Sequence, residues 1–198
     1  MKETNPWIMA YFVVDVETAP LDYKKYTETP EDKRAEFLNP IDSKIVAIGL
    51  RFEGKNTIFL SLDDEKKILE DFWAEWSSRR KGNNSFGIVG FNICDFDLPM
   101  LVGRSFVHNV TISPFVLKDI IDLRQKLSAY AYRPRGKLKE YASLIGLKVG
   151  EENGSMVAEW VAKGKANELG KYLESDLSIT DELFKRADTL NILKINRW

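Results

Sequence analysis

The segment Tyr11-Phe12-Val13-Val14-Asp15-Val16-Glu17 joins a short apolar run to two carboxylates separated by one residue. A run of β-branched and aromatic residues of this length is typical of a buried β-strand. Because side chains alternate along a strand, residues two apart point to the same face. We therefore expect Asp15 and Glu17 to stand side by side at the C-terminal end of this strand. Two anions this close must share a cation or a proton, and carboxylate oxygens suit Mg²⁺ or Mn²⁺.

The composition fits one globular enzyme-sized domain. Of the 198 residues, 44% are hydrophobic, which is enough for one sizeable core, and we predict a single domain over residues 1–198. The net charge of -1 argues against a protein that holds nucleic acid by a global basic field. The single cysteine, Cys94, excludes an internal disulfide and fits a reducing compartment. No stretch approaches the length of a membrane span, so we expect a cytoplasmic protein with no membrane contact.

The pattern along the chain predicts strands, an early antiparallel hairpin and then mostly helices. The expected strands are 11–15, 44–52, 56–60, 86–91 and 116–121. One helix is expected to begin at 63–65. Further helices are expected over 97–108, 123–129, 138–146, 156–163 and 166–193. The polar segment 18–43 is predicted to be a loop with one helical turn near 31–37, and 81–85 a turn. This order predicts an α/β layered domain with a mixed sheet.

Two more acidic clusters follow the first pair. The segment Asn92-Ile-Cys-Asp-Phe-Asp97-Leu-Pro99 lies where a strand is predicted to end and a helix to begin. Sites in open α/β sheets form at the carboxyl ends of strands, so we expect Asp97 to face the first pair. Tyr172 and Asp176 are four apart in a predicted helix and therefore share one helix face. The three clusters together supply four carboxylates and one phenol.

In this order, the three clusters resemble the Exo I, Exo II and Exo III motifs of the DEDDy 3′–5′ exonucleases, and especially the proofreading domain of family B DNA polymerases. The similar segments are 15–18, 92–99 and 172–176, with further similarity at 118–123 and 138–142. The resemblance spans roughly residues 12–183. No polymerase domain follows it, so we expect a stand-alone nuclease.

The resemblance implies an RNase H-like fold, in which a mixed β-sheet is flanked by α-helices. It implies hydrolytic release of nucleoside 5′-monophosphates from the 3′ end of single-stranded or frayed DNA, with two divalent ions, Mg²⁺ or Mn²⁺, as cofactors. Asp15 is expected to bridge both ions, Glu17 and Asp176 to complete the site of the ion that activates water, and Asp97 to hold the other ion, directly or through water. Tyr172 is expected to orient the attacking water, since an ordinary tyrosine with a pKa near ~10 is a poor base.

Asp95 competes with Asp97 for the role in the second motif. We prefer Asp97, because it follows Phe96 and precedes Leu98-Pro99 as in the family pattern. The resemblance also implies contacts to the terminal nucleotide from Thr18, Asn92 and Phe96, the last by stacking.

The segment Tyr130-Ala-Tyr-Arg133-Pro-Arg135-Gly-Lys137 mixes aromatic rings with cations. Such a loop suits single-stranded nucleic acid, because bases stack on the rings and the cations meet phosphates. We therefore assign Arg133, Arg135 and Lys137 to substrate binding. The only histidine, His108, is expected at the surface, and Cys94 in the core.

Two alternatives stay open. An RNA-trimming exonuclease would use the same residues, since no residue identifies a reader of the 2′-OH, although DNA is favoured. A non-catalytic nucleic-acid-binding accessory module is disfavoured, because it would have no chemical need for four carboxylates and a tyrosine. A role in DNA repair fits the proofreading resemblance, and polymerase or repair partners remain open.

Neutralising Arg133, Arg135 and Lys137 together should raise the KM for a long substrate, because three phosphate contacts are lost. It should also flatten the salt dependence of KM, since fewer counterions are released on binding. Steady-state kinetics across a salt series measure both effects. Kinetics identical to those of the unmodified chain at every salt concentration would exclude the loop from binding.

Overall fold

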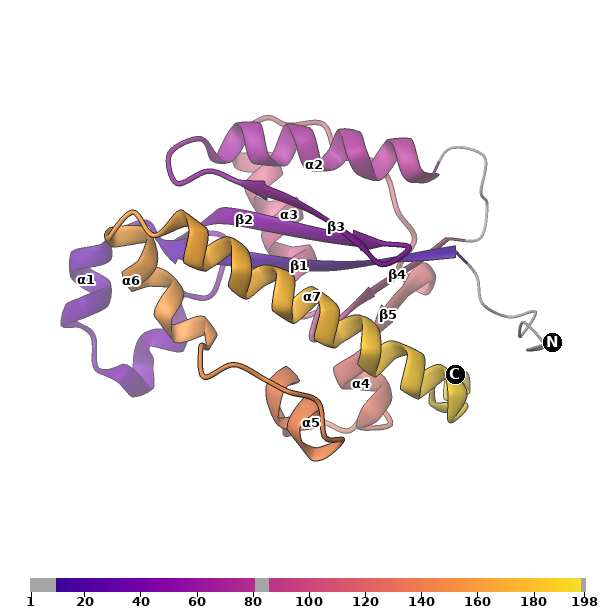
Figure 1. Cartoon of the computed structure of the whole chain (residues 1–198). Helices are drawn as coiled ribbons and strands as arrows, with labels where there is room; N and C mark the ends of the chain where they lie inside the picture. Colours follow the sequence, from indigo (N-terminus) through magenta and orange to yellow (C-terminus); the bar gives the residue numbers. More distant parts are fainter. Residues whose placement is uncertain (1–9, 81–85, 197–198) are drawn as a thin grey trace.

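Five strands form one mixed sheet in the computed structural model, which describes residues 10–80 and 86–196 (Figure 1). They are β1 (Ala10–Pro20), β2 (Ser43–Phe52), β3 (Lys55–Leu60), β4 (Phe86–Gly90) and β5 (Ile120–Asp122). Their order across the sheet is β3-β2-β1-β4-β5, with β1, β2 and β3 antiparallel and β1, β4 and β5 parallel. The predicted α/β domain with a mixed sheet is confirmed. The turn predicted at 81–85 lies outside the described residues.

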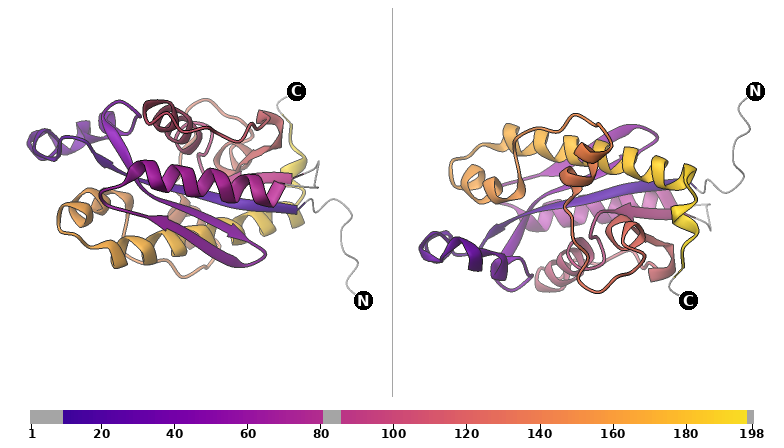
Figure 2. Two further views of the ribbon diagram at one scale, coloured as in Figure 1. Left: turned by 90° about the horizontal axis from the view of Figure 1, so that it is seen from above. Right: turned by 90° about the horizontal axis from the view of Figure 1, so that it is seen from below.

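Helices cover both faces of the sheet. They are α1 (Tyr23–Glu28), α2 (Glu65–Arg80), α3 (Asp97–Val107), α4 (Leu123–Leu127), α5 (Leu138–Leu144), α6 (Val157–Ala162) and α7 (Ala166–Thr189). Short 3₁₀ turns occupy η1 (Glu31–Phe37), η2 (Leu117–Asp119), η3 (Gly154–Met156) and η4 (Ile192–Lys194). The two long helices α2 and α7 lie on opposite faces of the sheet, as the views from above and below show (Figure 2). None of the described helices is long and apolar enough to cross a membrane.

Strand β1 divides its side chains between the two faces. Phe12 and Val14 are buried in the core that α2 and α3 cover. Val13 is buried in the other core, beneath α7. Because side chains alternate, Asp15 and Glu17 fall on the same face as Val13, under the helices of the second half of the chain.

The expectation that Asp15 and Glu17 end the strand is wrong, because β1 continues to Pro20. The parallel pairing of β1 with β4 does end just before them, at Val13 and Val89, and beyond this point β1 follows β2. The register with β2 shifts immediately after Glu17, where a β-bulge interrupts the ladder. The two acids therefore lie just beyond the last residue pair that β1 forms with β4.

Several local predictions need correction. Helix α1 lies within the segment predicted as a loop, and it was missed because none of its residues is buried, so it shows no apolar periodicity. The turn expected near 31–37 is η1. The strand expected at 116–121 is mostly η2, and only Ile120–Asp122 pairs with β4. Helix α7 ends at Thr189 rather than near 193, and η4 follows it.

A buried ion cluster fastens α2 to α3 and to the start of β2. Glu65 Oε1 accepts from Arg104 Nε at 2.9 Å and from the Ile45 amide at 2.7 Å, while Glu65 Oε2 accepts from Arg104 Nη2 at 2.7 Å. His108 Nε2 lies 2.7 Å from Glu65 Oε2. His108 lies at the end of α3, but its side chain is only partly exposed because it joins this cluster, so the expectation of a surface residue is met only in part.

Replacing Glu65 with Gln should reduce the free energy of unfolding at neutral pH by about 3 kcal/mol, because Arg104 loses its buried counterion. Burial favours the neutral acid, but hydrogen bonds from Arg104, the Ile45 amide and His108 hold the pKa of Glu65 below its ordinary value. The stabilisation is therefore complete above the ordinary pKa and disappears as the pH falls through the lowered one. Denaturant unfolding from pH 7 to pH 3 measures it, with the exposed Glu70→Gln as control. A constant difference between the Glu65→Gln variant and the parent chain at every pH would contradict the prediction.

Candidate metal centre

Three carboxylates from distant parts of the chain converge on one side of the sheet. Asp15 and Glu17 of β1 and Asp176 of α7 each offer an oxygen, and these oxygens all lie within 4.8 Å of one another. Asp176 is buried, and Glu17 is only 9% exposed. Among the described residues, this group has the composition and spacing of a site for a divalent cation.

A glycine allows α7 to approach the sheet closely enough to deliver Asp176. Gly49 of β2 pairs with Asp15 of β1. A Cβ atom at position 49 would lie 2.6 Å from Leu177 Cδ1 and 2.9 Å from Leu173 Cγ, closer than side chains can pack. Leu173 and Leu177 flank Asp176 on the buried face of α7. The missing side chain of Gly49 therefore sets the distance between the acids on β1 and the acid on the helix.

Asp97 reaches the same region from the start of α3. Its Oδ1 accepts a hydrogen bond of 2.9 Å from the backbone amide of Val16, which stands between Asp15 and Glu17 in sequence. Asp97 is 2% exposed, whereas its competitor Asp95 is exposed. Asp97 is not one of the three carboxylates that lie within 4.8 Å of one another. The structure thus places Asp97 beside the first pair, as the sequence predicts, through a bond to the backbone of β1.

The site carboxylates destabilise one another's charged forms. Burial raises the pKa of Asp15 and of Glu17 well above the ordinary range, and the charges of the neighbouring acids raise both further. Burial also raises the pKa of Asp97 to about 7. The pKa of Asp176 is raised by burial, although Lys139 and Tyr172 partly oppose the shift. A cation bound among these groups would relieve both the desolvation and the repulsion.

One buried oxygen of the site lacks a hydrogen-bond partner among the described residues. Asp176 Oδ1 is buried and accepts no hydrogen bond from the described residues, and Lys139 Nζ lies 3.7 Å from it. Buried carboxylate oxygens are nearly always bonded in folded proteins, so this one calls for a partner. Hard oxygen ligands without a partner are what Mg²⁺ and Mn²⁺ require, and the residues present therefore fit a divalent metal.

Tyr172 stands one helical turn before Asp176 on α7. Its ring packs edge-on against Trp160 of α6, with 5.6 Å between centroids, and Lys139 Nζ lies 4.5 Å from the ring centroid. Burial and then the negative charges of Glu17 and Asp176 raise the pKa of Tyr172 far above its ordinary value. Its hydroxyl therefore remains protonated and can donate a hydrogen bond, but it cannot act as a base at neutral pH.

The sequence analysis gave Lys139 no role, and the structure places it in the site. Lys139 extends from α5 to Asp176 and Tyr172. Its charge partly opposes the upward shift in the pKa of Glu17. Its Nζ also donates to the carbonyl oxygen of Glu152, which holds the ammonium in place. The signal was weak, because Lys139 is one of 29 lysines and arginines. Its position in the segment 138–142, which resembles the exonucleases, was the only pointer.

The predicted nucleotide-binding residues fall into two groups. Thr18 directly follows the β-bulge, while Asn92 and Phe96 lie in the segment that joins β4 to α3. These three flank the carboxylates in sequence, and Thr18 is buried.

The cationic segment lies between α4 and α5. The Arg133 guanidinium stacks on the exposed ring of Tyr132, and the Lys137 amide donates to Glu140 at the start of α5. Arg135 lines an open groove of about 700 Å³ together with Lys139. Lys139 therefore both lines this groove and lies beside Asp176 of the carboxylate site.

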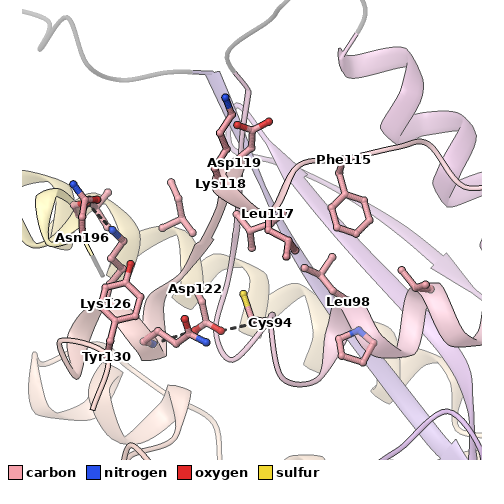
Figure 3. A pocket seen from close by; sticks show the side chains of 16 residues that line it. Cys94, Leu98, Phe115, Leu117, Lys118, Asp119, Asp122, Lys126, Tyr130 and Asn196 are labelled. Carbon is pink, nitrogen blue, oxygen red and sulfur yellow. Dashed lines mark hydrogen bonds between the residues drawn. The ribbon is translucent and has the colours of Figure 1, made fainter. Parts of the chain in front are cut away.

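A separate cavity of about 940 Å³ is lined by Cys94 and Leu98 of the neighbouring segment and by residues of 115–130 (Figure 3). Leu98, Phe115 and Leu117 contribute apolar wall, and Asp122 and Lys126 contribute polar groups. Cys94 lines this cavity and is only partly buried, so the expectation of a core cysteine is only partly met. Burial raises the pKa of Cys94 to about 12, so the thiol is not a nucleophile at neutral pH.

Comparison with known proteins identifies the family. Residues 35–192 match the sequence model of a family described as "Predicted 3'-5' exonuclease related to the exonuclease domain of PolB". The chain belongs to this family. The match includes Asp97, Tyr172 and Asp176, whereas Asp15 and Glu17 precede it.

Two further comparisons give a sequence relative and a structure of the same fold. The uncharacterized protein MJ0365 of Methanocaldococcus jannaschii is 35% identical over 160 residues, which cover 75% of this chain and 88% of that protein. The structure of the family B DNA polymerase from the hyperthermophilic archaeon Pyrobaculum calidifontis superposes with a TM-score of 0.72 at 17% identity. That superposition covers 96% of this chain and 26% of the polymerase chain, so this chain spans about a quarter of the polymerase. The fold is that of the polymerase B exonuclease domain, as the resemblance implied.

The Asp15→Asn variant should bind Mn²⁺ at least about tenfold more weakly than the parent chain, because one anionic ligand becomes a neutral amide. Isothermal titration of metal-free protein with MnCl₂ measures the affinity. Asp95→Asn removes the same charge from an exposed neighbour of the site and should leave the affinity unchanged. Equal affinities for all three proteins would show that Asp15 holds no metal.

Proposed function

We propose that this protein is a metal-dependent 3′–5′ exonuclease of the DEDDy type, which removes nucleoside 5′-monophosphates from single-stranded or frayed DNA. The observation that carries the proposal is the convergence of Asp15, Glu17 and Asp176 within 4.8 Å, with Asp97 bonded to the strand between the first two. Tyr172 stands one helical turn from Asp176 and completes the set of five. The family match supports this reading.

The carboxylates would hold the metal. Asp15, Glu17 and Asp176 would hold one ion, and Asp97 with Asp15 would hold a second. Two divalent ions bound here would stabilise charge on the attacking and leaving oxygens of an in-line phosphoryl displacement. The residues fix these positions in advance, because Asp97 is tied to the Val16 amide and Asp176 is set by the packing of α7 on Gly49.

Tyr172 and Lys139 would act on water and on charge. The Tyr172 hydroxyl stays protonated, so it would donate a hydrogen bond that orients the attacking water rather than remove its proton. Lys139 lies beside both Tyr172 and Asp176, where its ammonium offsets part of the negative charge of the cluster. It would also attract the scissile phosphate toward the carboxylates.

The substrate strand would leave the site along the groove beside Lys139. Thr18, Asn92 and Phe96 would contact the terminal nucleotide, because they flank the carboxylates in sequence. Arg135 lines the groove, and Arg133 and Lys137 belong to the same loop, so these cations would meet the phosphates of preceding nucleotides.

Digestion of matched end-labelled DNA and RNA oligonucleotides, with Mg²⁺ or Mn²⁺ and with EDTA, tests the proposal. Products should be 5′-mononucleotides released from the 3′ end, and EDTA should abolish release. The Asp15→Ala variant should be inactive, whereas Tyr172→Phe should retain activity with kcat lower by roughly a hundredfold, because one oriented hydrogen bond is lost.

Asp95→Asn is the matched control and should degrade DNA at the parent rate. An Asp15→Ala protein as active as the parent would sink the assignment of the site. A parent chain that binds oligonucleotides but releases nothing with either metal would favour the accessory module. Faster digestion of RNA than of DNA would identify an RNA-trimming enzyme.

A further inference from the structure

The segment that joins β4 to α3 is held by a single buried carboxylate. Asp122 Oδ1 accepts from the amides of Asn92, Arg124 and Gln125 at 3.0–3.2 Å, and Asp122 Oδ2 accepts from the Cys94 amide at 3.1 Å. The contact between Asp122 and Cys94 is visible in Figure 3. Asp122 is 4% exposed. The backbone of Asn92 is therefore fixed relative to α4, two residues beyond the last residue of β4.

Arg124, at the start of α4, also fixes the side chain of Asn92. Its Nη1 donates to Asn92 Oδ1 at 2.9 Å. A guanidinium has only donors, so the amide oxygen must face it and the Asn92 amide nitrogen must point elsewhere. Asn92 has a φ of 66°, a left-handed conformation that asparagine tolerates better than most residues. In this arrangement the free end of Asn92 offers hydrogen-bond donors only.

The same guanidinium reaches the cationic loop between α4 and α5. Arg124 Nη2 donates to the carbonyl oxygen of Pro134 at 2.7 Å. Three non-glycine residues of this loop, Ala129, Tyr130 and Arg133, have positive φ values of 48°, 59° and 51°. Such conformations cost free energy and persist only where the surroundings impose them. One side chain thus joins two segments to which we assign contacts with the substrate.

We propose that Arg124 is a positioning residue, which orients the Asn92 amide toward acceptor groups of the terminal nucleotide and ties that amide to the loop that binds the preceding phosphates. This inference rests on the proposed exonuclease function. Arg124 itself would touch neither the metal nor the scissile bond. The acceptors in question are oxygens and ring nitrogens that every nucleotide carries, so the contact would not select a sequence.

The Asn92→Asp variant separates this role from a structural one. The new carboxylate keeps its bond to Arg124, and Asp tolerates the left-handed backbone, but the donor directed at the nucleotide is gone. We expect kcat/KM on a single-stranded oligonucleotide to fall on the order of tenfold, with no loss of thermal stability. The loss should persist at high salt, which screens charge repulsion. An Asp variant as active as the parent at high salt would overturn the proposal, because Asn92 would then serve only as an acceptor for Arg124.

The Arg124→Met variant tests the link itself, with Arg186→Met on the exposed face of α7 as a matched control. We expect kcat/KM to fall roughly tenfold for Arg124→Met alone, but clearly less when the same substitution is made in Asn92→Gly, where only the bond to the Pro134 carbonyl oxygen is left to lose. Glycine keeps the left-handed backbone and removes the amide. Equal losses in both backgrounds would overturn the orienting role.

Hydrogen exchange supplies a measurement that needs no activity. In Arg124→Met, the amides of 92–96 and of 129–136 should exchange faster together, while the control shows neither change. Faster exchange confined to one segment would overturn the link even in an active enzyme. A parent chain that degrades no oligonucleotide would instead overturn the nuclease proposal, and the catalytic part of this inference with it.

Discussion

Repulsion among buried carboxylates is the constraint on which the rest of the site depends. The pKa of Asp15, Glu17, Asp97 and Asp176 is raised in each case, first by burial, because their charged forms are poorly stabilised. The fold must hold them together against this repulsion. It does so with rigid elements: a central strand paired on both sides, and a helix packed closely on a glycine.

Two other buried carboxylates show that this electrostatic state is not a general property of the fold. Asp181 accepts from Tyr11 and Arg51 and pairs with Lys185, and its pKa is lowered despite burial. The pKa of Glu65 is likewise lowered by donors that surround it. Both acids fasten helices to the sheet, and each has enough cations and amides to remain charged. Within the described residues, the acids on β1 have fewer such partners, the Val16 amide for Asp15 and the Lys139 charge for Glu17, and a bound metal is the partner that their chemistry suits.

The parts of the site predicted from sequence are those set by local periodicity. Alternation along β1 places Asp15 beside Glu17, and helical spacing places Tyr172 beside Asp176. The parts that escaped prediction depend on tertiary packing: the bond from the Val16 amide to Asp97, the reach of Lys139 from α5 to α7, and the continuation of β1 beyond the acids. Helix α1 escaped for the opposite reason, since it buries no side chain and therefore leaves no pattern.

The family match covers residues 35–192 and excludes the acids of β1, so similarity alone does not establish a complete site. Hydrogen bonding and packing connect the matched residues to the acids of β1. Asp97 and Asp176, which lie inside the match, are held against Asp15 and Glu17 by a backbone hydrogen bond and by helix packing. Neutral side chains at these positions would remove the repulsion and make the fold more stable. A binding module would become more stable with neutral side chains here, whereas a metal-dependent nuclease would lose its metal ligands. The presence of four acids that lower the stability of the fold therefore favours the nuclease over the binding module.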